Sequence, residues 1–339
     1  MNLLASCKNN KSLWLCYLVL NLNPDICDAK NKPMPFLIFA LTYPLIWVFS
    51  RLPMRILYIK SDVFFFLIFY VLRYRKKIVY DNISLAFPEK SSEEKKKILR
   101  LFFKHFTDLF MESVKAFSIS EKEILKRYKY KNPELINDLV KQGKSIALVG
   151  AHQANWEWSI SLPLALEGSI YGAYTKLGNK YFEKAVRDSR EKFGVLGYKT
   201  SETVKGMQKN FSEKIQGLYI LLSDQSPQLH KTHYWTEFFG VKVPIHTGAE
   251  MLAKKFDLVV VNYVTTKVKR GFYETEFQLV VENPRDYKEY EITDKYLALT
   301  EENVKKQPEL YLWTHKRFKH RNKFEEWQKM KVAKPKTKS

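Results

Sequence analysis

The sequence predicts an α/β fold, with a mixed, largely parallel central sheet flanked by helices and preceded by an N-terminal helical membrane anchor. Three observations predict it. From residue 145 onward, apolar runs of strand length alternate with helical patterns, which is typical of a largely parallel sheet. Residues 36–50 are uncharged and strongly apolar. All 12 glycines lie at or after Gly143, which excludes a glycine-rich dinucleotide or phosphate loop from the preceding residues.

The predicted anchor covers residues 34–80 and contains two apolar runs. The first, at 36–50, is shorter than the ~20 residues that a spanning helix needs. The second, at 63–72, ends in a basic cluster at 73–77, and such clusters favour the cytoplasmic side of a membrane. The region forms either one tilted span that continues past Arg51 or two shallow interfacial helices, and a pair of buried core helices is the alternative. Residues 1–33 form an extension to which no structure is assigned.

The main domain is predicted at residues 81–321, and its first helix covers 91–117. Ser91 or Ser92 can cap this helix, and apolar residues then recur at helical spacing. His105 lies within it, and we interpret it as a packed side chain. Further strands are expected at 146–149, 170–174, 218–222, 258–264 and 273–281, and further helices at 180–193, 202–214 and 248–255.

The chain is strongly basic, with a net charge of +21. This balance favours an anionic partner, whether nucleic acid, an anionic membrane or an acidic protein. A basic C-terminal tail is predicted at 322–339, as either a solvated helix with a frayed end or a contact with an anionic surface. The cysteines are Cys7, Cys16 and Cys27, which excludes a cysteine nucleophile from the main domain.

The most informative stretch is residues 145–158, where a buried strand is expected to run into His152, with Glu157 five positions later. Residues five apart do not share a helix face. The two side chains therefore meet only if His152 lies in the turn after the strand and Glu157 in the first turn of the next helix. Asn155 is a suitable N-cap for that helix. A second acidic residue, Asp224, follows the strand at 218–222, and ligands bind beyond the carboxyl ends of such strands.

A histidine and a carboxylate in this arrangement fit acyl transfer without a covalent enzyme intermediate. A neutral imidazole can remove the proton of an attacking hydroxyl. A carboxylate on the other ring nitrogen then fixes the tautomer and stabilises the imidazolium that forms. His230, His233 and His246 match no standard metal-site spacing, so no metal is predicted.

Several motifs in order give the chain a resemblance to the late acyltransferases of lipid A biosynthesis, the lauroyl/myristoyl acyltransferase family within the lysophospholipid acyltransferase-like group. The similarity runs from about Pro35 to Arg321. Its motifs are Tyr43-Pro44-Leu45, residues 50–53, 82–88, 150–157, 223–225 and 238–240, the helix that contains Arg187 and Arg190, and Trp313-Thr314-His315-Lys316-Arg317. Many members have glycine where Ala154 stands, and a basic residue with proline where Thr175 and Lys176 stand.

The resemblance implies an enzyme of the bacterial inner membrane, with its site on the cytoplasmic face. It would move an acyl chain from acyl carrier protein, a co-substrate, to a hydroxyl group of a membrane glycolipid at an anionic membrane surface. No cofactor and no nucleic-acid partner are implied.

The same resemblance assigns roles to individual residues. His152 would be the general base and Glu157 its partner. Arg187 and Arg190 would contact acceptor phosphates or the developing oxyanion, and Asp224 would position those arginines or the acceptor. Asn155 and Lys176 complete the expected substrate-binding set, with a phosphate contact moved to Lys176.

Two alternatives remain open at this point. The same chemistry fits a different membrane lipid acceptor, such as an aminolipid or a phosphoglycolipid. A non-catalytic basic protein that binds membranes or nucleic acid would explain the charge, although it leaves the order of the motifs unexplained.

Overall fold

The structure, a computed structural model, describes residues 34–332. The predicted extension at 1–33 and the end of the predicted tail, 333–339, lie outside the described residues. The α-helices are α3 (Met34–Arg51), α4 (Met54–Phe66), α5 (Lys76–Ala86), α6 (Ser92–Ala116), α7 (Glu121–Arg127), α8 (Glu134–Lys141), α9 (Lys180–Glu191), α10 (Thr203–Ser212), α11 (Gly248–Phe256), α12 (Glu291–Lys306) and α13 (Phe324–Val332). The strands are β1 (Tyr128–Tyr130), β2 (Ile146–Gly150), β3 (Ile170–Tyr174), β4 (Leu196–Lys199), β5 (Leu218–Leu222), β6 (Tyr234–Phe238), β7 (Val241–Ile245), β8 (Val259–Lys269) and β9 (Phe272–Val281).

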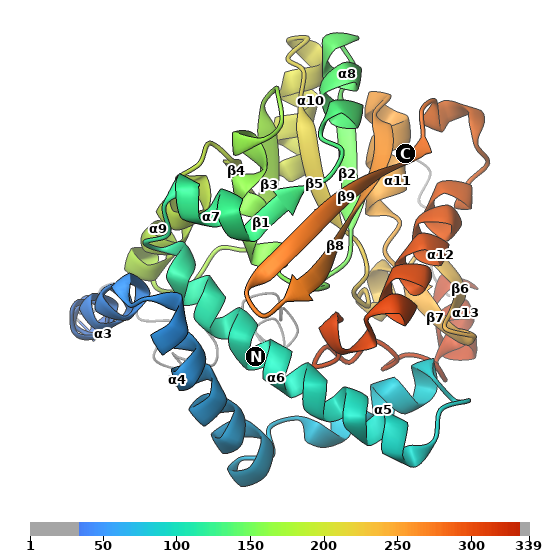
Figure 1. The fold of residues 1–339 in the computed structure, drawn as a ribbon. Coiled ribbons are helices and arrows are strands. Elements are labelled where there is room, and N and C mark those ends of the chain that lie inside the picture. Colours follow the sequence, from blue (N-terminus) through green and yellow to red (C-terminus); the bar gives the residue numbers. More distant parts are fainter. Residues whose placement is uncertain (1–33, 333–339) are drawn as a thin grey trace.

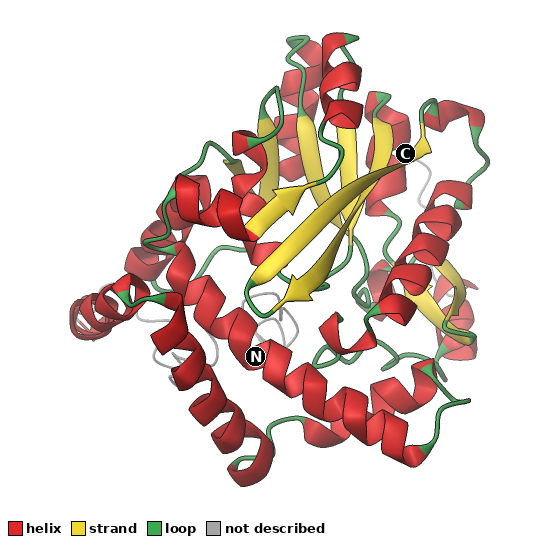
Figure 2. Ribbon diagram, viewed as in Figure 1, coloured by secondary structure: helices red, strands yellow, loops and turns green. Residues whose placement is uncertain are grey.

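A seven-stranded sheet in the order β1-β9-β8-β2-β5-β3-β4 forms the centre of the molecule (Figure 1). All neighbouring strands run parallel except β8 and β9, which form an antiparallel hairpin. Helices cover both faces of this sheet, as Figure 2 shows. The predicted mixed, largely parallel sheet flanked by helices is therefore confirmed.

The middle strand, β2, is apolar throughout because both of its faces are covered. Ile146, Ala147 and Leu148 are fully buried, and Val149 is nearly so. Strands of parallel sheets that are buried on both faces read as continuous apolar runs for this reason. The strand has β8 on one side and β5 on the other. Residues that follow β2 and β5 therefore leave the sheet side by side.

The long helix α6 crosses below the sheet and passes the tip of the β8–β9 hairpin (Figure 1). It begins at a capping box, in which the Ser91 side chain accepts from the Glu94 amide and the Glu94 carboxylate accepts from the Ser91 amide. Such boxes satisfy two backbone donors at once. The helix predicted at 91–117 is confirmed. His105 is buried, as expected, and its ring contacts the Ala154 carbonyl.

The apolar N-terminal segment forms two helices rather than one. α3 ends at Arg51 and α4 begins at Met54, so of the two forms predicted for the anchor, the structure does not show the single helix that continues past Arg51. The apolar run continues from α4 as one π-helical stretch, Leu67–Val71. Among the residues described, no helix combines the length and apolar character needed to cross a membrane.

The outer faces of these two helices remain largely apolar. Most of the exposed large apolar side chains of the described residues fall between Phe36 and Leu72. A pair of buried core helices would not show such exposure. The inner faces pack on the domain, where Phe39 of α3 contacts Tyr181 and Phe182 of α9.

The C-terminal part closes the fold beside the small β6–β7 hairpin. The predicted tail begins as a short helix, α13, whose Phe324 packs on Trp235. The Trp327 indole donates to the Thr232 carbonyl. The part of the tail that the structure describes is thus a largely exposed helix, as the first alternative predicted, and Phe324 and Trp327 dock one side of it on the domain.

Candidate active site

The candidate site lies where β2 and β5 end. Gly150 and Leu222 are register partners at the last positions of these strands. His152 follows one strand by two residues and Asp224 follows the other by two residues. Because the strands are parallel neighbours, the two side chains arrive at the same edge of the sheet.

Asp224 holds His152 at two points. The ring Nδ1–H donates to Asp224 Oδ1 over 2.6 Å, and the backbone amide of His152 donates to Asp224 Oδ2 over 3.2 Å. The Asp224 side chain is only 1% exposed, whereas that of His152 is 14% exposed. This arrangement leaves Nε2 as the basic position of the ring, where its lone pair accepts a long hydrogen bond of 3.4 Å from the Gln225 amide nitrogen.

The pair shifts the pKa values of both groups in the directions expected of an ion pair. Burial alone would lower the pKa of His152, but the charge and hydrogen bond of Asp224, with a further contribution from Glu157, raise it above its ordinary value. Burial would raise the pKa of Asp224, but the charge and hydrogen bonds of His152 lower it. The imidazole is therefore more basic than a free one.

Glu157 does not make the contact that the sequence predicted. Asp224, rather than Glu157, binds Nδ1 of the His152 ring. Glu157 instead pairs with Arg190, 3.1 Å away. Asp224 takes this place because β2 and β5 are neighbours in the sheet, which brings Asp224 beside His152. Likewise, the sequence predicts that Asp224 positions the arginines or the acceptor, whereas in the structure its carboxylate contacts His152.

The turn between His152 and Glu157 is shaped by its backbone and by one cap. Ala154 has a positive φ of 52°, and the Asn155 side chain accepts from the Trp158 amide, as predicted for an N-cap. The helix that follows, η3 (Trp156–Leu164), is a 3₁₀-helix rather than an α-helix. Its Ser159 and Ser161 hydroxyls bond carbonyls three residues back, which competes with α-helical bonding.

A cavity of about 540 Å³ opens at this edge of the sheet. Its polar lining includes His152, Glu157, Arg187, Arg190 and Gln225. The rest of the wall is largely apolar, with aliphatic side chains from β5, α9, α10 and α11, namely Ile220, Leu222, Val186, Val204, Met251 and Leu252. A concave site with few polar groups on an apolar wall is typical of small-molecule binding.

The other predicted substrate-binding residues differ in their placement. Arg187 lines the cavity and lies 3.9 Å from Glu191, a long contact along one helix face. Lys176 is exposed, and its neighbours Thr175 and Leu177 line the cavity while Lys176 does not.

Asn155 is fully buried and does not line the cavity, so the structure does not place it where the predicted substrate contact needs it. Its amide nitrogen donates to Glu112 Oε2 over 2.7 Å, within the protein. The sequence does not single out Glu112, because nothing in the pattern of a 25-residue helix shows which distant side chains one of its glutamates contacts. In the part of the chain that is described, no three His, Cys, Asp or Glu side chains gather in a metal-like cluster.

Two comparisons bear on this site. A sequence profile for the family described as bacterial lipid A biosynthesis acyltransferase matches residues 31–320. The chain is also 25% identical over 307 residues to the lipid A biosynthesis lauroyltransferase of Escherichia coli (strain K12), a match that covers 88% of this chain and 96% of the relative.

Proposed function

Because the chain belongs to the bacterial lipid A biosynthesis acyltransferase family, we propose that it moves a fatty acyl chain from an acyl carrier protein thioester to a hydroxyl group of a lipid A precursor. Its lauroyltransferase relative supports a medium-length chain as the first donor to test. The observation that carries the proposal is that the His152 ring lines the cavity while Asp224 binds its Nδ1.

His152 acts as the general base. Its Nε2 takes the proton of the acceptor hydroxyl as that oxygen attacks the carbonyl carbon of the thioester. A carbon–oxygen bond forms, the carbon–sulfur bond breaks, and the thiolate leaves with the proton from the imidazolium. Asp224 fixes the tautomer and stabilises the imidazolium, the role that the sequence assigned to Glu157.

Glu157 and the arginines act at the polar wall of the cavity. The Glu157 carboxylate pairs with Arg190. Burial lowers the pKa of His152, and Asp224, with a smaller contribution from Glu157, more than offsets this and raises it. Arg190 and Arg187 supply positive charge toward an acceptor phosphate or the developing oxyanion. Lys176, exposed beside the cavity wall, is a third basic group for the acceptor headgroup.

The apolar wall holds the acyl chain, and the exposed helices hold the enzyme at the membrane. The outer faces of α3 and α4 carry apolar side chains next to the basic residues Arg51, Arg55 and Lys60, a pattern typical of helices that lie in the membrane interface. The net charge of +21 suits both an anionic bilayer, on the cytoplasmic side of the inner membrane, and an acidic carrier protein.

The test is a transfer assay with the purified full-length chain, an acyl carrier protein thioester and a lipid A precursor, read by mass spectrometry of the lipid. We expect His152→Ala to lower turnover ~10²–10⁴-fold, as is typical of the loss of a general base. The matched control is His230→Ala, at an exposed position that does not line the cavity.

Parallel reactions with an aminolipid acceptor, and with acyl coenzyme A as donor, identify the true substrates. Acylation of the aminolipid alone would replace the acceptor in the proposal. Binding of lipid without transfer to any acceptor would contradict the enzymatic assignment altogether.

A further inference from the structure

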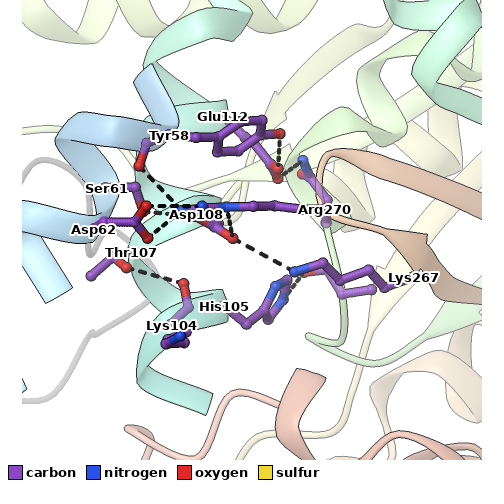
Figure 3. Close-up of polar contacts among 12 residues, drawn as sticks. Tyr58, Ser61, Asp62, Lys104, His105, Thr107, Asp108, Glu112, Lys267 and Arg270 are labelled. Carbon is purple, nitrogen blue, oxygen red and sulfur yellow. Dashed lines mark hydrogen bonds and ion pairs between the residues drawn. The ribbon is translucent and has the colours of Figure 1, made fainter. Parts of the chain in front are cut away.

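A buried carboxylate below the catalytic turn has no role in the chemistry described so far. Glu112 lies on α6 and is fully buried. Its Oε1 accepts from the Tyr58 hydroxyl over 2.8 Å, and its Oε2 accepts from the Tyr273 hydroxyl over 2.8 Å and from the Asn155 amide over 2.7 Å. Figure 3 shows Glu112 and Tyr58 close together at one end of the polar cluster between α4, α6 and the β8–β9 hairpin.

Each of these bonds joins a different part of the fold. Tyr58 comes from α4, Tyr273 from β9, and Asn155 from the turn that follows His152. Both oxygens of the carboxylate are thereby used, and its position is fixed from three directions. A buried group held in this way has little freedom, because any movement leaves a polar partner unsatisfied.

Asn155 links Glu112 to the turn that follows His152. Its Nδ2 donates to Glu112, while its Oδ1 accepts from the Trp158 amide and caps η3. Glu157, which pairs with Arg190, lies in the first turn of that helix. Trp156, also in that turn, sets its ring against the His152 ring with the centroids 5.4 Å apart.

α6 makes two further contacts with the same turn. The His105 ring donates from Nε2 to the Ala154 carbonyl over 3.1 Å, and the Trp158 indole donates to the Glu112 carbonyl over 3.1 Å. Burial lowers the pKa of His105 well below its ordinary value, with Lys267 acting in the same direction, so this ring is a neutral donor. One face of α6 thus supports the turn from Ala154 to Trp158.

We infer that Glu112 is a positioning residue for the transferase reaction, acting through Asn155 on the turn that carries His152 and Glu157. The inference rests on the proposed function. Misplacement of reacting groups by about 1 Å can lower a rate ~10²-fold, so a residue without substrate contact can control turnover. Its loss should reduce kcat and leave KM for the acceptor close to normal.

The experiment reverses the direction of the Glu112–Asn155 hydrogen bond. Asn155→Asp sets a second carboxylate against Glu112 where 2.7 Å now separates a donor from an acceptor, and we expect kcat to fall ~10²-fold. Glu112→Gln alone keeps one oxygen for Asn155, because the hydroxyl of Tyr58 can turn to accept from the new amide. The Glu112→Gln/Asn155→Asp pair restores a donor opposite an acceptor, and kcat should recover to within about tenfold of Glu112→Gln.

Asp108→Asn is the matched control. Asp108 lies one turn earlier on α6 and is also buried, but it pairs with Arg270 and Ser61 and makes no hydrogen bond to the catalytic turn. We expect this variant to lose stability while the folded enzyme keeps its kcat. A structural role for the whole cluster would lower kcat equally in both positions.

Asn155→Ser provides a second measurement if Asn155→Asp does not fold. Serine keeps an N-cap oxygen but has no amide for Glu112. We expect its kcat to fall about tenfold. Full kcat in Asn155→Ser, or a folded double variant without recovery, would overturn the inference. Wild-type protein that transfers no acyl group would instead refute the proposed function, so the two failures are distinguishable.

Discussion

At the scale of single residues, the basicity of His152 gives a prediction about pH. The proposed base works only as neutral imidazole, so activity is lost as the pH falls through the pKa of His152. Because Asp224 raises this pKa above the ordinary value of about 6.5, the acid limb of kcat/KM should lie above pH 6.5. A pH profile of the wild-type enzyme measures this directly.

Asp224→Asn tests the cause of that shift. The variant removes the charge that raises the pKa, so the acid limb should move to lower pH, while the maximal rate falls up to ~10⁴-fold because the ring loses its fixed tautomer. Glu157→Gln, which removes a smaller contribution to the same pKa, should move the limb less. A larger shift with Glu157→Gln would assign the orienting role to Glu157 after all.

Ala154 carries a second prediction at this scale. Its φ of 52° lies in the left-handed region, where a side chain costs roughly 1–2 kcal/mol and glycine costs little. Ala154→Gly should therefore change the free energy of unfolding by less than about 1 kcal/mol and keep activity. Ala154→Val, with a branched side chain at this φ, should lower both. Equal behaviour of the two variants in thermal unfolding would contradict the strain at this position.

At the scale of elements, the sequence predicts where strands and helices lie along the chain better than which strands are neighbours in the sheet. The strands β2, β3 and β5 and the helix α6 match their predicted ranges closely, because each strand is a local apolar run and the helix has a local apolar period and a local cap. Strand order depends on contacts between distant segments. The sequence therefore placed His152 and Asp224 at strand ends without showing that β2 and β5 are neighbours, and it gave Glu157 the contact that Asp224 makes.

The elements without a strong local signal were missed. β1 has three residues and β4 has four, too few for an alternating pattern to stand out. The two strands of the β6–β7 hairpin have five residues each, and the charged residues of α12 interrupt its apolar pattern. The hairpin packs against the C-terminal segment through Trp235 on Phe324 and Phe238 on Phe318, contacts that the sequence does not show. The buried contact between α6 and Asn155 is likewise invisible from sequence, since 43 residues separate its partners.

The junction of α4, α6 and the β8–β9 hairpin carries a stability prediction. Arg270 donates to both Asp108 and Asp62 (Figure 3). The Asp108 side chain is nearly fully buried. Arg270→Met leaves that buried carboxylate without its main cation, and we expect the free energy of unfolding to fall by about 1–3 kcal/mol in denaturant titrations. The exposed pair Lys77–Asp81 is the control, since Lys77→Met should change it by less than about 1 kcal/mol. Similar losses in both variants would contradict a special role for this junction.

At the scale of the whole molecule, the apolar outer faces of α3 and α4 and the net charge of +21 set the expected behaviour at a membrane. Apolar area drives insertion into the interface, and the basic groups add an attraction to anionic lipid that salt screens. The full-length chain should therefore bind vesicles that contain anionic phospholipid more tightly than neutral ones. The difference should shrink at high salt, whereas part of the binding should remain.

The apolar contribution can be separated from the charge by two substitutions on one face of α4. Ile59 and Val63 lie four residues apart and are 63% and 56% exposed. Their replacement by asparagine leaves the net charge and the core unchanged. If these side chains enter the lipid, each substitution weakens the free energy of membrane binding by roughly 1.5–3 kcal/mol, the value for burial of one apolar side chain. Sedimentation with anionic vesicles should then show at least tenfold weaker binding of Ile59→Asn/Val63→Asn. Leu279→Asn, at an exposed site on β9, should bind as the wild type does. If the α4 variant sediments like the control at every salt concentration, this face does not enter the membrane.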